Sequence, residues 1–352
     1  YGGTYPGPTI EARTGLPVTV RWINDLRDEG GTPRTDHYLE VDLCPHGPNH
    51  LGPTPRTVTH LHGGHVPAEY DGYPEFTDLP GEMSEYVYPN DQDAATLWYH
   101  DHALGITRLN VYLGLAGFYL VRDDVEDALG LPSGSYEIPL VIQDRTFNSD
   151  GSLFYPGPWQ DHFFGDTILV NGKVWPYLDV DRGKYRFRVL NGSNSRTYTL
   201  ALDDGATFYQ IGSDGGLLEA PVPLTTLTLA PAERADLVID FASYAPGTEI
   251  VLENSAPAPF PGDPGVGVVP NVMQFRVGAA DGDQDPIPGA LRPVEPIDEA
   301  EAVMSREFEM RRFSEPCAGS HWLINELRWD DIAEYPILGS TEIWSFVNRS
   351  SA

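Results

Sequence analysis

Short runs in which polar and apolar residues alternate, separated by Gly and Pro, constrain the fold of this chain most. Residues 18–22, 185–189 and 342–346 each alternate with the period of two that marks a half-buried strand. The 36 glycines and 32 prolines interrupt such runs throughout the sequence. Only residues 123–131, which are followed by Pro132, have the pattern of a helix. The sequence therefore predicts an all-β protein made of β-sandwiches.

A weak internal repeat sets the expected number of domains. A glycine, a strand and a closing asparagine recur at residues 15–24, 183–191 and 339–348, and the last two copies follow matched segments at 169–175 and 323–329. A turn glycine followed by a strand and an asparagine is also common in β-sandwiches generally, so a chance similarity without a true repeat stays open as the alternative. The repeat predicts one domain over residues 1–121 and a second over 136–277. After an acidic, Pro-rich connector, residues 303–352 would form the first part of a third, whose later strands we expect elsewhere.

The charge of the chain is strongly one-sided. Asp and Glu total 52 against 22 Lys and Arg, the formal net charge is −30, and Lys173 and Lys184 are the only lysines. A negative field of this size repels nucleic acid and anionic lipid, so neither is an expected partner. Acids in place of lysine suit concentrated salt, where the screening length falls to roughly 3 Å at 1 M. We therefore predict a halophilic protein, and an acidic secreted protein is the simpler alternative.

Two further features of the sequence limit the classes of protein to which the chain could belong. No run of about 18 apolar residues is present, which predicts that no segment crosses a membrane. The two cysteines, Cys44 and Cys317, lie far apart and outside any CxxC or zinc-type pattern. They could form one disulfide in an oxidising compartment or remain two unrelated thiols, and the sequence leaves both possibilities open.

Four of the ten histidines form two identical patterns, His60-Leu-His62 and His100-Asp-His102. Residues i and i+2 of a strand point to the same face about 7 Å apart, so each pair presents two imidazoles side by side. Two glycines after His62 leave room for a metal and the backbone to approach. A single such pair is most often structural, but two pairs in one small sandwich predict a metal site. Because imidazole suits copper and no thiolate or carboxylate triad lies nearby, copper is the predicted metal.

The other histidines do not repeat this paired pattern. We interpret them as surface or packing residues, with His65 as the one candidate for a supporting place behind the metal ligands. They are His37, His46, His50, His65, His162 and His321.

Together with these histidines, several segments resemble the bacterial three-domain multicopper oxidases, closest to spore-coat laccase and its bilirubin-oxidase-like relatives. The resemblance covers nearly the whole chain and includes residues 5–10, 71–74, 144–146, 151–155, 168–176, 229–234 and 339–344. It implies a cupredoxin-like Greek-key sandwich in each domain and a trinuclear copper cluster between the first and third domains.

The resemblance also implies a role for individual residues. By motif position His60 resembles a type 2 copper ligand, whereas His62, His100 and His102 resemble type 3 ligands. Asp71 matches an acidic residue that helps deliver protons to bound oxygen, although its Asp-Gly context also explains it as a turn residue.

The chain departs from this family in its last part. The HxPxHxH and HCHxxxH motifs, which carry the other cluster ligands and the type 1 copper ligands in such enzymes, are not present, and no histidine follows His321. We therefore expect a second, C-terminal chain to complete the third domain. The loop at residues 255–266 corresponds to the wall of the substrate pocket over the type 1 copper in such enzymes but differs from it in composition. The preferred electron donor therefore cannot be inferred from the resemblance.

The resemblance implies a secreted or extracytoplasmic enzyme of the laccase type. Such an enzyme couples one-electron oxidation of phenols or similar small aromatic donors to four-electron reduction of O2 to water, with copper as cofactor. A non-catalytic cupredoxin-like scaffold or a copper-binding protein is the alternative. Retention of all four paired histidines favours the oxidase, and the scattered methionines Met83, Met273, Met304 and Met310 do not indicate copper storage.

Overall fold

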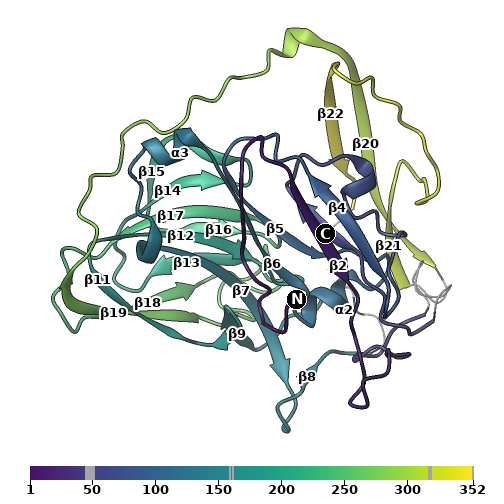
Figure 1. Cartoon of the computed structure of the whole chain (residues 1–352), viewed down its shortest axis with the longest axis horizontal. Coiled ribbons are helices and arrows are strands. Elements are labelled where there is room, and N and C mark those ends of the chain that lie inside the picture. The colour runs from purple at the N-terminus through teal and green to yellow at the C-terminus, as the bar shows by residue number, and fades with distance from the viewer. Residues whose placement is uncertain (44–51, 158–159, 161, 316–318, 351–352) are drawn as a thin grey trace. The chain divides into compact units, whose positions relative to one another are not determined.

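The computed structural model describes residues 1–43, 52–157, 160, 162–315 and 319–350 (Figure 1). It divides into two compact units, residues 1–293 and 294–352. Strands dominate the described residues of both units, which confirms the predicted all-β, tandem-sandwich fold. Cys44, Cys317, His46 and His50 lie outside the described residues, so the two possibilities for the cysteines stay open. No helix in the described ranges has the length and apolar content needed to cross a membrane.

The first sandwich packs a four-stranded sheet against a two-stranded one. Its core holds Leu61, Tyr88, Leu97, Tyr99 and Tyr119, each at most 1% exposed. The larger sheet has the order β1-β6-β5-β3 and the smaller pairs β2 with β4. These strands are β1 (Ile10–Arg13), β2 (Val18–Ile23), β3 (Thr59–His62), β4 (Met83–Tyr88), β5 (Ala95–Asp101) and β6 (Ala116–Arg122).

The second sandwich is larger and surrounds its own apolar core, which includes Ile168, Leu200, Phe241 and Phe275, all fully buried. One sheet has the order β10-β9-β7-β12-β17-β14-β15, with β8 paired to β7, and the other has the order β11-β19-β18-β13-β16. The first sheet contains β7 (Glu137–Phe147), β8 (Leu153–Phe154), β9 (Thr167–Val170), β10 (Lys173–Val174), β12 (Lys184–Asn191), β14 (Phe208–Ser213), β15 (Gly216–Leu224) and β17 (Arg234–Asp240). The second contains β11 (Tyr177–Arg182), β13 (Tyr198–Leu202), β16 (Leu227–Leu229), β18 (Glu249–Asn254) and β19 (Asn271–Asp281).

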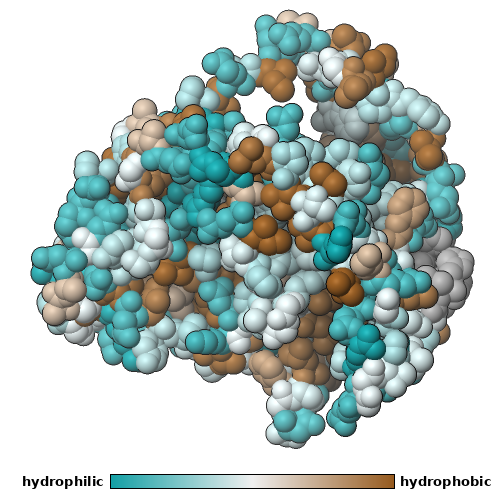
Figure 2. Space-filling model, viewed as in Figure 1, coloured by the Kyte–Doolittle hydropathy of each residue, from teal (hydrophilic) through white to brown (hydrophobic). Residues whose placement is uncertain are grey.

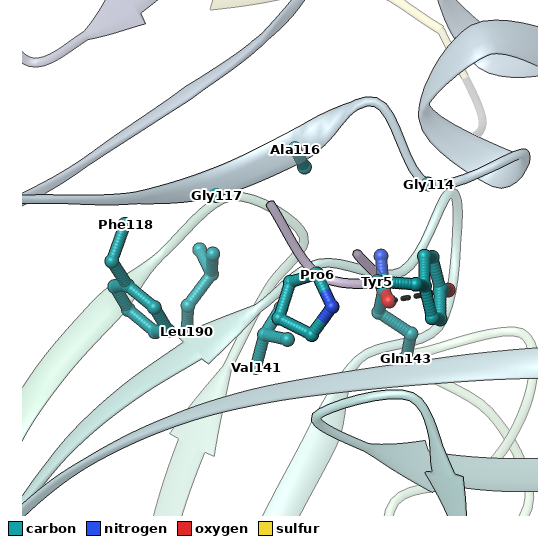
Figure 3. Close-up of a pocket in the computed structure, with 9 residues that line it drawn as sticks. All are labelled: Tyr5, Pro6, Gly114, Ala116, Gly117, Phe118, Val141, Gln143 and Leu190. Atoms are coloured by element: carbon teal, nitrogen blue, oxygen red, sulfur yellow. Dashed lines mark hydrogen bonds between the residues drawn. The ribbon is translucent and has the colours of Figure 1, made fainter. Parts of the chain in front are cut away.

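The N-terminal segment lies between these two sandwiches. Tyr5 and Pro6 insert between β6, on one side, and the β7 and β12 residues Val141, Gln143 and Leu190 on the other (Figure 3). The Tyr5 hydroxyl donates to Gln143 Oε1 at 2.7 Å, and the space around the pair is too small for a water molecule. This contact is therefore a packed seam that joins the sandwiches and not a ligand site.

The helices only partly follow the prediction. Helix α3 (Asp124–Ala128) lies in the predicted segment, and the side chain of its N-cap Asp123 accepts from the Glu126 amide at 2.8 Å. A second helix, α2 (Thr107–Tyr112), was not predicted. Apart from Arg108 and Leu109 its residues have low helical preference, and burial of its last four side chains stabilises it. Three short 3₁₀ turns complete the helical residues described: η1 (Ala68–Tyr70), η2 (Gly134–Tyr136) and η3 (Glu299–Glu301).

The predicted connector between the second and third domains is shorter than expected. Strand β19 continues to Asp281, and the next strand already begins at Ala302. Leu291 is buried, and Arg292 forms ion pairs with Asp93 and Asp123 of the first sandwich. Part of the connector is therefore fixed to the first unit. The first compact unit contains both complete sandwiches, so the structure does not test the predicted limits of the three domains, and these stay predictions.

The second unit forms one sheet of described strands, with the order β21-β20-β22. The strands are β20 (Ala302–Glu315), β21 (Gly319–Ile324) and β22 (Thr341–Asn348). Strand β20 pairs in parallel with β22 and antiparallel with β21, as β7 does with β12 and β9. The internal repeat therefore corresponds to a repeated supersecondary unit.

The asparagine shared by both copies explains why the repeat is visible in the sequence. Asn171 has φ 49° and exchanges two hydrogen bonds with the backbone of Val141, at 2.9 and 3.0 Å. Asn325 has φ 53° and makes the same two bonds with Glu309, both at 2.8 Å. Asparagine tolerates this left-handed conformation and supplies the side-chain acceptor, so both turns require the same residue.

Candidate metal centre

The four predicted histidines are placed by one pair of strands in the first sandwich. Strands β3 and β5 are antiparallel, and their register sets His60 directly opposite His100 and His62 opposite Trp98. Since side chains of a strand alternate, His60, His62 and His100 project from the same face of the sheet. His102 follows the end of β5, where its backbone N–H donates to Val58 O at 2.8 Å.

This register brings all four imidazoles together. The His60 ring centroid lies 5.8 Å from that of His62, 5.5 Å from His100 and 5.3 Å from His102. His100 lies 5.5 Å from His62 and 5.4 Å from His102. One small space is therefore bordered by nitrogen donors from both predicted pairs.

The donor atoms fit a metal ion. One ligand atom from each of His60, His62 and His100 lies within 4.8 Å of the other two, and His62 Nδ1 lies 3.3 Å from His100 Nε2. Imidazole nitrogens bind ions such as zinc at about 2.0–2.1 Å, so two nitrogens sharing a tetrahedral metal lie about 3.3 Å apart. Nitrogen donors without thiolates also match the preference of copper.

Backbone carbonyls fix two of the rings from behind. His60 Nδ1 donates to Asp71 O at 2.7 Å, and His100 Nδ1 donates to Asp101 O at 2.8 Å. A carbonyl only accepts, so in each ring the proton sits on Nδ1 and the lone pair on Nε2. These bonds leave Nε2 of His60 and of His100 able to bind a metal ion.

The surroundings favour the uncharged form of three of the imidazoles. Burial and then the nearby Arg234 charge together lower the pKa of His62 to about 4, and burial moves the pKa of His100 well below its ordinary value. Burial also lowers the pKa of His102. Only the neutral imidazole binds a metal, so at neutral pH no proton competes for these nitrogens.

Asp71 lies at the edge of the cluster, at the end of η1. Its carboxylate Oδ1 is 3.2 Å from His60 Nδ1, in addition to the 2.7 Å bond that its backbone carbonyl accepts. Burial raises the pKa of Asp71, and the neighbouring His60 and His102 oppose that rise. The structure therefore places the predicted acid beside a predicted metal ligand, with its side chain 43% exposed.

Arg234 is a supporting residue that the sequence did not single out, although it ends the matched segment 229–234. Its buried guanidinium donates to Thr96 O on β5 at 3.1 Å and to Asp214 O at 3.1 Å. Gly63 follows His62 with φ +84°, and a Cβ there would lie 2.7 Å from Arg234 Nη2. The second sandwich therefore confines the turn that carries His62.

A cavity of about 380 Å³ opens beside the cluster in the first unit. Trp98 stacks on His100 with ring centroids 4.2 Å apart, and the wall also includes the half-buried Arg108. The remaining lining residues are His62, His102, Thr107, Val111, Ser193, Asn194, Pro231 and Ala232. Water and small solutes can therefore reach the three histidines that line it.

The structure places the other described histidines away from the cluster. His37 is buried and hydrogen-bonded, as expected of a packing residue. His65 is exposed, and its Nδ1 lies 3.4 Å from Asp91 O, so it has no contact with the cluster among the described interactions. His162 is exposed beside Phe164, and the side chain of His321 lies outside the described residues.

Comparison with known proteins supplies the context for this geometry. Residues 45–126 match the family model of the multicopper oxidases. A laccase of Bacillus stratosphericus is 45% identical over 99% of this chain and 71% of its own length, and a laccase of Haloferax volcanii is 39% identical over 99% of this chain and 64% of its own. The crystal structure of the McoA multicopper oxidase of Aquifex aeolicus aligns with a TM-score of 0.78 and 31% identity, over 97% of this chain and 72% of that one.

We predict that Gly72→Ala detaches His60 from its support. Gly72 has φ +75°, and a Cβ there would overlap with the carbonyl oxygen of Thr59 in β3. The Asp71–Gly72 turn must then move, which loosens the bond from His60 Nδ1 to Asp71 O. Copper affinity, measured by chelator competition, should fall on the order of tenfold. Gly15→Ala is the matched control, since Gly15 has φ +72° with open space around it, and an equal loss of copper in both variants would contradict the prediction.

Proposed function

Because this chain belongs to the multicopper oxidase family, we propose that His60, His62, His100 and His102 hold part of its trinuclear copper cluster. His60 would bind the type 2 copper, and the other three would bind the type 3 coppers, as their motif positions imply. The convergence of the four rings carries this proposal, since the centroids of His62, His100 and His102 all lie within 5.8 Å of that of His60. Two carbonyl-fixed tautomers and neutral imidazoles support it.

The protein is a laccase-like oxidase, which oxidises a reducing substrate at the expense of O2. Copper supplies the redox chemistry when bound, and the residues of this chain supply position and proton control. His60 and His100 are oriented by carbonyls, His62 is confined by the Gly63 turn, and Trp98 covers one side of His100. The non-catalytic scaffold is not favoured, since the similar curated relatives are laccases. We propose small phenols or similar aromatic compounds as donors.

We propose that Asp71 delivers protons at the cluster. Its carboxyl group lies 3.2 Å from His60 Nδ1, and burial raises its pKa above the ordinary value, which favours a group that can hold as well as release a proton. Reduction of O2 to water consumes protons, so a carboxyl beside the cluster has a direct use. Its partial exposure supports exchange of protons with solvent.

We expect Asp71→Asn to separate proton delivery from copper binding. The amide keeps the shape of the side chain and leaves the backbone carbonyl bonded to His60, so copper content should be unchanged. Oxygen consumption with a phenolic donor should fall on the order of 10²-fold, with a changed pH profile. Asp78→Asn is the control, because Asp78 is another half-buried carboxyl with a raised pKa but bonds Ser84 instead. The ligand proposal has its own test. His100→Ala removes one proposed ligand, so the purified variant should contain less copper, and full copper content would refute the ligand proposal.

We propose that the active enzyme carries the remaining copper ligands outside these 352 residues, which lack the ligand motifs that the resemblance implies. The laccase of Bacillus stratosphericus has residues without a counterpart in these 352, since the chain spans 71% of its length. Denaturing electrophoresis with intact-mass measurement of the active enzyme tests the origin of these ligands. Two polypeptides would place these ligands on a second, C-terminal chain, as the resemblance led us to expect, and one longer polypeptide would place them on the same chain as the four histidines. An active enzyme made of these 352 residues alone would contradict the proposal.

We propose that the protein works in concentrated salt and outside the cytoplasm. Its net charge of −30 with two lysines supports the first part, and hydrophilic residues dominate the surface around α3 and β15 on the face in Figure 2. The extracytoplasmic part follows from the resemblance to laccases of that kind, and fractionation of the source cells would test it.

We expect salt to raise the thermal midpoint of unfolding at pH 7, because it screens repulsion among the carboxylates. Near the pI of about 4.4 the net charge vanishes, and the same salt should have a much smaller effect. Scanning calorimetry between about 0.1 and 1 M salt at both pH values measures this difference. A midpoint that stays flat or falls at pH 7 would exclude the halophilic proposal.

A further inference from the structure

A chain of buried polar side chains lies behind the His100–His102 segment, and none of its members belongs to the predicted site. Asp101 is 0% exposed, Asn110 1% and His37 9%. They come from β5, from α2 and from the segment that precedes β3. Because side chains of a strand alternate, Asp101 projects from the face opposite to that of His100.

The Asp101 carboxylate joins the two ends of the metal-binding strands. Its Oδ2 accepts from the Val58 amide at 2.9 Å, just before β3, and its Oδ1 accepts from the Ala103 amide at 3.0 Å, just after His102. The Asn110 side chain donates to the same Oδ1 at 2.7 Å. Without these three donors a fully buried carboxylate would be strongly destabilising, so its position is determined by them.

The hydrogen bonds of Asn110 have only one consistent direction. Its Nδ2 donates to Asp101 Oδ1 and, at 3.0 Å, to Arg56 O, both of which are acceptors. Its Oδ1 must then accept from His37 Nε2, which lies 2.9 Å away. A neutral His37 protonated on Nε2 has a bare Nδ1, and the Leu39 amide donates to that atom at 3.0 Å. The same Nδ1 also lies 3.1 Å from Leu39 O, a contact that it could use only as a donor in a doubly protonated ring. Burial lowers the pKa of His37, which favours the neutral ring and therefore this arrangement of the network.

We propose that Asn110, held by His37, is a positioning residue for the copper ligands His100 and His102. The inference rests on the proposed copper site and extends it to residues that touch no metal ion. Asp101 lies between the two histidines in the sequence, and its backbone carbonyl accepts a hydrogen bond from His100 Nδ1 at 2.8 Å. Fixing the Asp101 side chain therefore fixes the carbonyl that aims His100 Nε2 at the position 3.3 Å from His62 Nδ1.

Asn110→Leu tests this role, since leucine has a similar volume and can neither donate nor accept. Mutation of a residue that hydrogen-bonds behind the metal ligands typically lowers metal affinity about 10–100-fold. The copper affinity of the purified variant should therefore fall by at least about tenfold. The measurements are chelator competition and the absorption spectrum of the bound cupric ions, which should change with the geometry of the nitrogen donors.

Asn254→Leu is the matched control. Asn254 is also buried, at 2% exposed, and its side chain makes three hydrogen bonds, to Thr199, Ala256 and Val269 in the second sandwich. This variant should lower the thermal midpoint comparably but leave copper affinity within about twofold and the absorption spectrum of the bound cupric ions unchanged. If both variants lose the same copper affinity, Asn110 acts through general stability, and the proposal is overturned.

A pair of substitutions at His37 supplies the conservative rescue. The amide of His37→Gln can donate to Asn110 Oδ1 in place of Nε2, whereas His37→Leu cannot. Copper affinity should stay within about threefold in the first variant and fall on the order of tenfold in the second. Equal affinities in the two variants would overturn the role of His37. His100→Ala tests the copper site independently of Asn110. Full copper content in that variant would refute the proposed function, whereas loss of copper there with unchanged affinity in Asn110→Leu would refute only the role of Asn110.

Discussion

The antiparallel register between β3 and β5 is the constraint on which the whole site depends. A slip of one residue would turn His60 and His62 to the core face and bring Leu61 to their place. The register is held because Leu61 and Tyr99, paired opposite each other, are both 1% exposed in the core of the first sandwich. The burial that folds the sandwich therefore also selects the face on which the imidazoles appear.

The second sandwich holds this arrangement from outside the first. Trp98 and Phe118 pack with Val141 and Leu190 across the seam between the two. Nearby, the buried Arg186 and Arg188 pair with Glu126, Glu137 and Asp236, and loss of one partner in such a network costs about 3–5 kcal/mol. Although burial opposes it, the hydrogen bond from Arg122 and the charges of Arg188 and Arg186 hold the pKa of Glu137 to about 2. Its contribution to stability is thus fully present above the unfolded pKa of about 4.3 and is lost only as the pH falls toward 2.

The sequence predicted those features that depend on local periodicity. Alternation located the strands, and the i, i+2 spacing of His60 and His62 predicted a shared face. It did not predict α2, because burial of Asn110 and its neighbours stabilises that helix more than the propensity of its residues does. Arg234 lies against Gly63, far away in the sequence, and His37 bonds Asn110 across 73 residues, so no local pattern records these contacts. Asn110 is only 9 residues from Asp101, but it reaches that carboxylate through a helix that the sequence did not predict.

Asp71 contacts His60 through two groups, its backbone carbonyl and its side-chain carboxylate, and only the second of these can titrate. The backbone carbonyl accepts the 2.7 Å bond from Nδ1, and the carboxylate oxygen lies farther away at 3.2 Å. A carbonyl does not titrate, so the orientation of the ring does not depend on whether the carboxyl is protonated. The side chain can therefore gain and lose a proton beside the cluster without releasing the ligand it touches. A residue that held His60 through its carboxylate alone would change the ligand geometry with each proton it passed on.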